Sequence, residues 1–267
     1  MSEFPSRVGG SANCIDAILL AGGRGARLGP YTAVLPKPLV PLGDMPVLEI
    51  LLRRLRMHGL TNLAVCTGHL AELIAAFFGD GARFGVRLHY TREDKPLGTA
   101  GPIRNVANLG DPFVVMNGDL LTTLDISALL ENHRESDADA TIAIHPREVL
   151  IDFGVMDVGS DGLLQQYREK PVYHFDVSMG VYVFRKWAAE LIRPGERLDI
   201  PDLIGRIQQN GGRVACFRSR CEWLDIGRPD DYARAQEQFE RDRSIFLPAE
   251  TEATSTTCEL QTTGPAY

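Results

Sequence analysis

The chain has 267 residues, with 28 Lys plus Arg against 35 Asp plus Glu, so its formal net charge is −7. At 44% hydrophobic and 24% charged residues, the composition excludes a disordered chain, and no apolar run reaches the ~18 residues of a membrane span. The acidic balance argues against a general nucleic-acid binder, which needs a surplus of basic residues. Any anionic ligand must therefore be met by a local group of positive charges.

The cysteines and the two ends of the chain bear on compartment and domain organisation. The five cysteines are scattered and form no CxxC pair, which argues against a disulfide framework or a zinc site. Residues 1–13 hold no apolar core of signal-peptide length, so we expect a cytoplasmic protein. Both 1–13 and 247–267 lack apolar periodicity and are predicted to be flexible tails, which leaves residues 14–246 as a single domain.

Short apolar runs and amphipathic stretches alternate along the chain. The apolar runs predict buried strands at Ile15–Leu20, Leu63–Cys66, Phe113–Met116, Thr141–Ile144 and Val177–Phe184. The amphipathic stretches predict helices at Val47–His58, Ala71–Phe78, Ile126–Glu135 and Asp230–Arg241. This alternation predicts a three-layer, Rossmann-like α/β fold, in which a mixed, mostly parallel sheet carries helices on both faces. Two further segments, Phe153–Val158 and Leu163–Glu169, flank a turn-rich tetrapeptide and predict a hairpin.

The first predicted strand leads into a glycine-rich loop, LLAGGRGARL, at residues 19–28. Backbone N–H groups around Gly22 and Gly23 can close on phosphate oxygens, and Arg24 and Arg27 add full positive charges. The dinucleotide fingerprint GxGxxG fails because Leu28 stands at the third glycine, and no GK[ST] follows to make a P-loop. A tight strand-to-helix connection with incidental arginines is the structural alternative.

Two further residues suit phosphate chemistry. Lys37 stands between Pro36 and Pro38, which restrict the backbone and would hold its ammonium rigidly. Asp119 follows the predicted strand Phe113–Met116, at the sheet edge where α/β folds bind ligands, and a carboxylate there suits Mg²⁺. Taken alone, the lysine could mark a surface turn and the aspartate a helix or turn cap.

The run LLAGGRGARL followed by PKPLVPLGDMPVLE resembles the signature of the sugar-1-phosphate nucleotidyltransferases, the nucleotide-sugar pyrophosphorylases. Later motifs follow in the family's order: PLGTAG (96–101), NGD (117–119), FGV (153–155), EKP (169–171) and WLDIG (223–227). The resemblance covers about residues 14–240 and is strongest toward mannose-1-phosphate guanylyltransferase-like members. It implies the nucleotide-diphospho-sugar transferase fold. It also implies direct in-line transfer of a nucleotidyl group from an NTP to a sugar 1-phosphate, with Mg²⁺ and release of pyrophosphate.

The resemblance also implies roles for individual residues. The catalytic residues would be Arg27, Lys37 and Asp119, and the metal ligands Asp119 and Asp225. The nucleotide-binding residues would be Leu20, Ala21, Gly22, Gly23, Arg24, Glu93, Gly98 and Thr99. The sugar phosphate would be held by Gly154, Glu169, Lys170 and Ser178. Structural alternatives remain open: a turn cap for Asp225, a helix cap for Thr99, and a solvated surface pair for Glu169 and Lys170.

The chain departs from the family pattern at two places. Ala26 replaces the usual Thr or Ser, which removes one hydroxyl contact to phosphate. Ser178-Met179 replaces the usual Asn-Ala before Gly180, so we expect an unusual sugar phosphate or a sugar-like cyclitol phosphate as acceptor.

The base and the assembly are further expectations from the resemblance. The PLGTAG motif favours GTP over dTTP, UTP or CTP. A catalytically inactive nucleotide-sugar-binding regulatory protein is the second hypothesis, and a nicotinamide dinucleotide enzyme is disfavoured by the broken fingerprint. The resemblance implies a homo-oligomer, a dimer or tetramer formed through the catalytic domain, because the sequence contains no repetitive left-handed β-helix.

Overall fold

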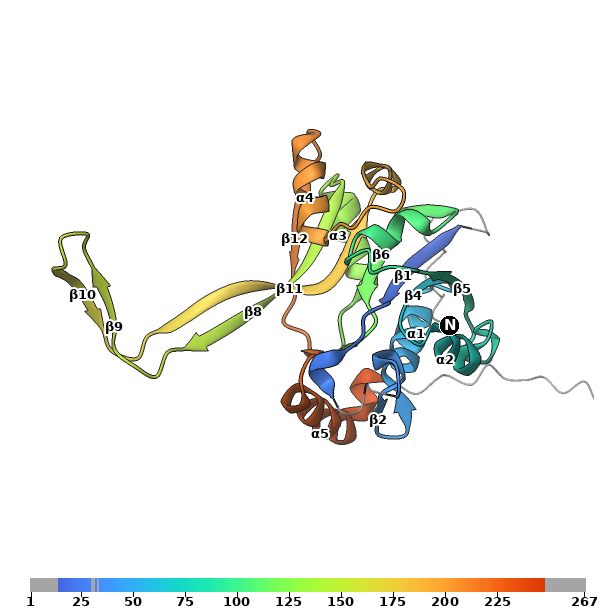
Figure 1. Ribbon diagram of the computed structural model, residues 1–267, viewed down its shortest axis with the longest axis horizontal. Coiled ribbons are helices and arrows are strands. Elements are labelled where there is room, and N and C mark those ends of the chain that lie inside the picture. Colours follow the sequence, from blue (N-terminus) through green and yellow to red (C-terminus); the bar gives the residue numbers. More distant parts are fainter. Residues whose placement is uncertain (1–13, 30–31, 33, 248–267) are drawn as a thin grey trace, which may run out of the picture.

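The computed structural model describes residues 14–29, 32 and 34–247, so the predicted tails lie almost wholly outside the described residues. Its centre is a seven-stranded sheet (Figure 1). The strands are β1 (Ile15–Ala21), β4 (Asn62–Thr67), β5 (Arg87–Arg92), β6 (Leu109–Asn117), β8 (Ala140–Leu150), β11 (Val172–Phe184) and β12 (Val214–Arg218). They lie in the order β12-β8-β11-β6-β1-β4-β5, and β11 runs against all the others. This confirms the mixed, mostly parallel sheet.

Helices cover both faces of the sheet, as predicted. One face packs against α1 (Val47–Met57), α2 (Ala71–Phe78) and α3 (Ile126–Glu135). The other packs against α4 (Ile200–Gln209) and two 3₁₀ segments, Gly101–Asn105 and Lys186–Leu191. Side chains of β6 alternate between the two cores, because successive residues of a strand point to opposite faces. No helix within the described ranges combines the length and apolarity needed to cross a bilayer.

Most predicted elements form close to their predicted bounds, and the omissions have physical reasons. Helices α2 and α3 match in full, and α1 ends one residue before His58. Helix α4 escaped prediction because Pro201 opens it and Gly205 interrupts its helix propensity. Strand β5 was missed because it is an edge strand with exposed polar side chains and no continuous apolar run. Strand β12, at the other edge, holds a short apolar run at 214–217 that the prediction overlooked.

A third apolar cluster fastens the last helix, α5 (Pro229–Phe246), to the loop that follows β1. Phe239 and Phe246 of this helix pack with Leu28 and with the short hairpin of β2 (Pro41–Leu42) and β3 (Met45–Pro46). Beside it, β7 (Leu120–Thr122) pairs with β13 (Trp223–Asp225). This pairing sets the WLDIG motif next to the NGD motif, although about a hundred residues separate them in sequence.

Strands β8 and β11 continue beyond the sheet as a two-stranded ribbon that projects from the body of the molecule (Figure 1). The ribbon ends in the predicted hairpin, which forms from β9 (Val155–Val158) and β10 (Leu164–Arg168). We call residues 145–178 the arm. Its hairpin was predicted, but its projection was not, because β8 was expected to end at Ile144 and β11 to begin at Val177.

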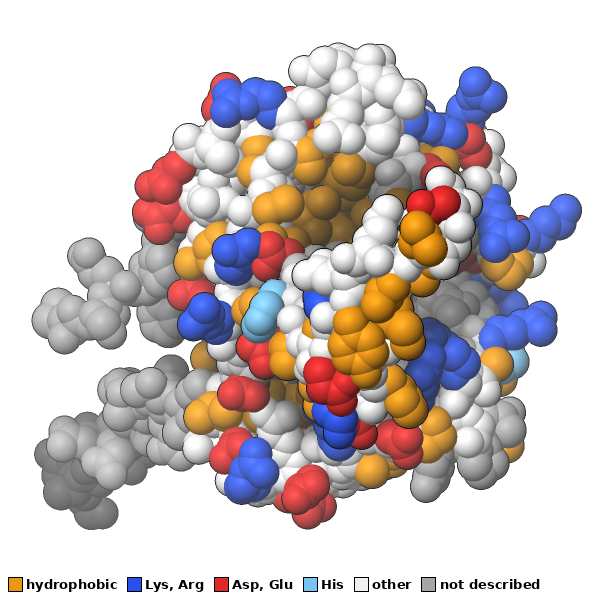
Figure 2. Space-filling view, turned by 90° about the vertical axis from the view of Figure 1, so that its left-hand side faces the viewer, with side chains coloured by type: hydrophobic (Ala, Val, Ile, Leu, Met, Phe, Trp, Pro, Cys, Tyr) orange, Lys and Arg blue, Asp and Glu red, His pale blue; other side chains and the backbone are white. Residues whose placement is uncertain are grey.

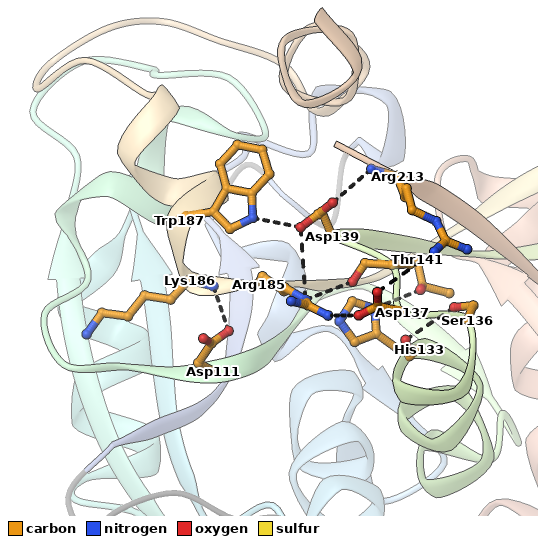
Figure 3. A network of polar contacts seen from close by, with 11 residues as sticks. Asp111, His133, Ser136, Asp137, Asp139, Thr141, Arg185, Lys186, Trp187 and Arg213 are labelled. Atoms are coloured by element: carbon orange, nitrogen blue, oxygen red, sulfur yellow. Dashed lines mark hydrogen bonds and ion pairs between the residues drawn. The ribbon is translucent and has the colours of Figure 1, made fainter. Parts of the chain in front are cut away.

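A polar network connects residues at the end of the sheet that lies opposite the carboxyl ends of β1 and β6 (Figure 3). Asp139 lies at its centre, just before β8. Its carboxylate accepts hydrogen bonds from Trp187 Nε1 at 2.9 Å and from the backbone N–H of Arg213 at 2.8 Å. Burial acts to raise the pKa of Asp139, but these hydrogen bonds and the nearby charge of Arg185 together hold the pKa below the ordinary 3.8.

We expect Asp139→Ala to lower the free energy of unfolding by about 1–3 kcal/mol, since two donors lose their charged acceptor. Because the folded-state pKa is depressed, this contribution is present above the ordinary carboxyl pKa and is lost as the pH falls through the lower folded value. Urea titrations followed by tryptophan fluorescence measure it. The control is Glu131→Ala at an exposed position of α3, where the change should stay within about 0.5 kcal/mol. Equal losses in both variants would contradict this assignment.

Candidate active site

The glycine-rich loop after β1 borders a cleft of about 520 Å³ at the carboxyl ends of β1 and β6. Five sequence segments meet there, and the cleft is lined by Leu20, Ala21, Gly22, Gly23, Arg24, Gly25, Ala26, Arg27, Lys37, Pro38, Glu93, Pro96, Gly98, Thr99, Pro102, Asn117, Gly118, Asp119 and Gly227. The lining includes each of the predicted nucleotide-binding residues and each of the predicted catalytic residues. The structure therefore brings these two groups together.

Contacts within the glycine-rich loop and with Thr32 fix its conformation. A short 3₁₀ turn, Ala26–Leu28, buries Leu28 beneath it, and Thr32 Oγ1 donates a hydrogen bond to the Gly25 carbonyl at 2.8 Å. Arg24 and Arg27 are exposed, and the described residues provide neither with a hydrogen bond or an ion pair. Their guanidinium groups are therefore available to an anion in the cleft.

Lys37 is mounted as its flanking prolines predict. Pro36 is extended and precedes the 3₁₀ segment Lys37–Leu39, in which Pro38 and Leu39 are buried. The Lys37 side chain is 11% exposed and forms an ion pair with Asp119. Its Nζ also lies 3.9 Å from Asp225 Oδ1. One ammonium is thus placed between two carboxylates at the edge of the cleft.

The backbone brings the two carboxylates to this lysine. The Gly118 N–H donates to the Leu20 carbonyl at 2.9 Å, and a Cβ at Gly118 would lie 2.8 Å from that oxygen, so glycine permits the contact. The Ile226 N–H donates to the Asp119 carbonyl at 3.1 Å, which fixes Asp225 alongside. Burial, and then the charge of Asp119, raise the pKa of Asp225, while Lys37 and Arg27 act to lower it.

The chemistry of this donor set fits a magnesium ion. No group of three or more His, Cys, Asp or Glu within the described ranges could hold a metal. Mg²⁺, however, needs only one or two carboxylates and takes its other ligands from substrate phosphates and water. Burial, and then the charge of Asp119, disfavour the ionised form of Asp225, and a dication bound between the two carboxylates would favour it.

The loop that contains PLGTAG is fastened to α4. Thr99 donates from both its N–H and its hydroxyl to Asp199 Oδ1, at 2.9 and 3.3 Å, and its Oγ1 accepts from the Ile200 N–H at 2.9 Å. Gly98 has φ +79°, and a Cβ there would lie 2.5 Å from the Leu198 carbonyl oxygen. The Thr99 side chain therefore bonds to the first turn of α4, about a hundred residues further along the chain, and does not cap a helix at its own loop; it also lines the cleft. Asp199, which the sequence did not single out, is its partner.

Glu93 is the titratable group on the far side of the cleft. Its Oε2 accepts a hydrogen bond from the Leu97 N–H at 2.7 Å, and its Oε1 lies over Gly22, 2.5 Å from where a Cβ would be. Burial raises the pKa of Glu93, and the hydrogen bond from Leu97 acts in the opposite direction. Within the described ranges no hydrogen bond is donated to Oε1, so this oxygen can accept one from a ligand.

A second cavity of about 580 Å³ adjoins the first, and Arg27 and Gly227 line both. It holds Asp225, and the rings of His145 and Trp223 lie 5.6 Å apart in its wall. Three further arginines line it: Arg147, Arg228 and Arg234. These arginines were not among the predicted site residues, although Arg228 follows the WLDIG motif directly. The cavity suits a ligand that bears a phosphate and a ring.

The predicted sugar-phosphate residues lie in neither cavity. Gly154, Glu169 and Lys170 are on the arm, where Lys170 Nζ pairs with Asp152 Oδ1 at 2.9 Å and Tyr167 donates its hydroxyl to Glu169 at 2.9 Å. A Cβ at Gly154 would lie 2.3 Å from the hydroxyl of the exposed Tyr167, so a larger residue there would displace that side chain.

Two of the residues at which the chain departs from the family pattern, Ser178 and Met179, lie at the base of the arm. Ser178 shares a hydrogen bond of 3.0 Å with the Tyr182 hydroxyl. Met179 is fully buried in the core, and its carbonyl accepts from Trp223 Nε1 at 3.0 Å. The Met179 side chain therefore lies in the core and lines neither of these two cavities.

Comparison with known proteins finds relatives over most of the chain. The nucleotidyl transferase family matches residues 16–242. A UTP–glucose-1-phosphate uridylyltransferase of Synechocystis is 34% identical over 83% of this chain. A D-glycero-α-D-manno-heptose 1-phosphate guanylyltransferase of Aneurinibacillus thermoaerophilus is 30% identical over 85%. A solved structure from Bacillus anthracis, assigned as a glucose-1-phosphate thymidylyltransferase and containing sucrose, has a TM-score of 0.68 and 26% identity, covering 85% of this chain and 95% of that one.

The lengths of these relatives differ. The chain spans 62% of the Synechocystis protein and 99% of the Aneurinibacillus one. Several other curated relatives also exceed this chain, which covers less than two thirds of their length.

Proposed function

This chain belongs to the sugar-1-phosphate nucleotidyltransferase family, and we propose that it transfers a nucleotidyl group from an NTP to a sugar 1-phosphate, releasing pyrophosphate. The observation that carries this proposal is Lys37, held between Asp119 and Asp225 where the glycine-rich cleft meets the second cavity. Arg24 and Arg27 add positive charge along the same loop. Such a set of charges suits phosphoryl chemistry, which depends on positioning and charge neutralisation rather than on an enzyme nucleophile.

The two cavities divide the substrates between them. The NTP lies in the glycine-rich cleft, with its phosphates on the loop amides and on Arg24 and Arg27. The acceptor phosphate enters from the arginine-lined cavity and attacks the α-phosphorus in line, with pyrophosphate as leaving group. Lys37 neutralises the charge that develops on the transferring group. When bound by Asp119 and Asp225, Mg²⁺ supplies further charge neutralisation on the phosphate oxygens. We place this reaction in the cytoplasm.

The free oxygen of Glu93 supports GTP as the donor nucleotide. An ionised carboxylate only accepts hydrogen bonds, and guanine offers N–H donors on its Watson–Crick edge, where uracil, thymine and cytosine present fewer adjacent donors. Names of relatives cover guanylyl, uridylyl and thymidylyl transfer, so the choice rests on this group.

We expect Glu93→Gln to lower the preference for GTP over UTP, measured as the ratio of kcat/KM values, about tenfold, since one charged acceptor becomes a neutral amide. The change should fall mainly on the KM for GTP. Glu72→Gln, at an exposed helix position, is the control and should leave the ratio unchanged. A variant that lost activity equally with both nucleotides would remove Glu93 from base selection.

For the acceptor we propose a phosphorylated sugar or cyclitol. Trp223 and His145 provide ring surfaces, and Arg147, Arg228 and Arg234 provide charges for a phosphate or a second acidic group. Efficient turnover of common hexose 1-phosphates and none of cyclitol phosphates would reject the cyclitol alternative.

The test is a screen for pyrophosphate release with ATP, GTP, CTP, UTP and dTTP against a panel of sugar and cyclitol phosphates. We expect release that requires both substrates and Mg²⁺ and that is fastest with GTP. Binding of nucleotide sugars without release in any combination would favour the inactive regulatory protein instead.

A further inference from the structure

The arm carries the EKP motif away from the chain's own cavities. Along the arm, the ladder between β8 and β11 is continuous from Ser178↔Ile144 to Val172↔Leu150. His145 lies in the cavity wall, and Leu150 is five positions further along β8, a distance of about 17 Å along the strand. Lys170 lies beyond that point. This distance is much longer than a lysine side chain, so Lys170 of the same chain does not reach the acceptor cavity while the ladder is intact.

The arm is also unusually apolar for an exposed structure. Ten of the sixteen large hydrophobic side chains that are exposed in the described part of the chain lie between residues 149 and 175. Six of them, on the hairpin, are more than half exposed: Phe153, Met156, Val158, Leu163, Leu164 and Tyr167. Figure 2, which looks onto the end of the arm, shows hydrophobic side chains gathered along it. A contiguous patch of this kind marks an interaction surface.

The hairpin makes few connections to the body. The hydrogen bonds and ion pairs described for residues 151–171 all join residues of this same segment, such as Ile151 to Pro171, Arg168 to Asp157 and Lys170 to Asp152. An isolated two-stranded hairpin is marginally stable in water, so this segment gains most from packing on another surface. Lys170 also has φ +43°, a backbone conformation that non-glycine residues rarely adopt and that is frequent at binding sites.

We propose that the arm docks on a second copy of this chain and delivers Glu169 and Lys170 to the acceptor cavity of that copy, so that each active site is built from two chains. The inference rests on the proposed function, because it assigns these two residues to the acceptor. Lys170 binds the phosphate beside the cavity arginines, Glu169 accepts sugar hydroxyls, and the apolar side chains of the hairpin pack against the other copy.

We infer that a second copy of the chain is the docking partner, because the acceptor cavity of one chain can receive the Glu169–Lys170 pair that the arm of the other exposes. The acceptor cavity adjoins Asp119 and Asp225 but contains no lysine, and the arm of the same chain points away from the body (Figure 1). The cavity is lined by three carboxylates and four arginines, so both members of the Glu169–Lys170 pair meet opposite charges there. A reciprocal exchange completes both sites by one two-fold contact.

Complementation between two inactive variants tests the exchange. One chain carries Lys170→Ala in the arm and the other Asp119→Ala in the body. They are co-expressed with different tags and purified as the mixed dimer. If arms are exchanged, one of the two sites combines an intact body with an intact arm, and the mixed dimer recovers about half of the wild-type rate. If each arm serves its own body, the rate equals the mean of the two inactive parents, and the proposal is overturned.

The contact itself is tested without activity. Light scattering after gel filtration should find the wild-type chain as a dimer, and Phe153→Asp with Met156→Asp should convert it to a monomer with unchanged circular dichroism. Leu73→Asp is the control, since Leu73 is an exposed apolar residue in the first turn of α2, and it should remain a dimer. A monomeric wild type overturns the proposal. A dimer that depends on Phe153 but transfers no nucleotidyl group would instead reject the proposed function and keep the arm contact.

Discussion

Replacing Lys37 by Ala is expected to lower kcat for nucleotidyl transfer by about 10²–10³-fold, the effect of removing one preorganised cationic donor from a developing negative charge. Lys37 is 11% exposed and held between two carboxylates, so solvent cannot substitute for it readily. The KM for the NTP should change much less, because the loop amides, Arg24 and Arg27 remain. Steady-state pyrophosphate release with the best substrate pair measures both constants.

The matched control is Lys186→Ala, an exposed lysine of which only the backbone N–H forms a described hydrogen bond, to Asp111. It should retain wild-type kinetics. A Lys37→Ala enzyme with nearly normal kcat and a raised KM would mean that the lysine binds the ground state only, and the assignment to charge neutralisation in the transition state would be withdrawn.

Asp119→Asn should cost about 10³-fold in kcat, because it removes the carboxylate that pairs with Lys37 and that we assign to Mg²⁺. The amide is nearly isosteric, so the hydrogen bond from Ile226 to the backbone of residue 119 is kept and the fold should be unchanged. The distinctive result is a higher Mg²⁺ concentration at half-maximal rate, measured in a metal titration of the pyrophosphate assay.

For this variant the control is Asp202→Asn, an exposed aspartate in the first turn of α4. It should alter neither kcat nor the Mg²⁺ dependence. An Asp119→Asn enzyme that kept the wild-type Mg²⁺ dependence while losing rate would place Asp119 in the positioning of Lys37 alone.

The sequence predicts the centre of this fold well because the signals there are local. Buried strands such as β1 and β4 are continuous apolar runs, and α2 and α3 show their period directly. The glycine-rich loop and the PKP turn lie next to those strands, so the cleft could be predicted from the spacing of motifs.

Features that depend on long-range contacts were not predictable in this way. The meeting of Asp119 with Asp225 depends on the pairing of β7 with β13, two three-residue strands. The contact of Thr99 with α4 depends on Asp199, a hundred residues later. Likewise, Met179 is buried within an irregular stretch of β11, between Ser178 and Tyr182, which the alternation of residues does not reveal.

The direction of the arm is the feature that local sequence patterns predict least. Its hairpin was predicted from a turn flanked by alternating residues, but nothing local distinguishes a hairpin that folds back over its own cleft from one that projects. The answer lies in the length of the ladder between β8 and β11, which continues the sheet outward to Leu150. Motif order therefore located Glu169 and Lys170 in the sequence without locating them in space.

The most direct measurement of the central claim is a ³¹P NMR time course of GTP and a sugar or cyclitol 1-phosphate with the enzyme and Mg²⁺. If the site transfers nucleotidyl groups, the two substrates should disappear together. A nucleotide-sugar diphosphate and inorganic pyrophosphate should then appear at equal rates, with no signal from inorganic phosphate. The same products should form, at different rates, with other donor nucleotides. Release of inorganic phosphate, or persistence of every substrate pair, would contradict nucleotidyl transfer at this site.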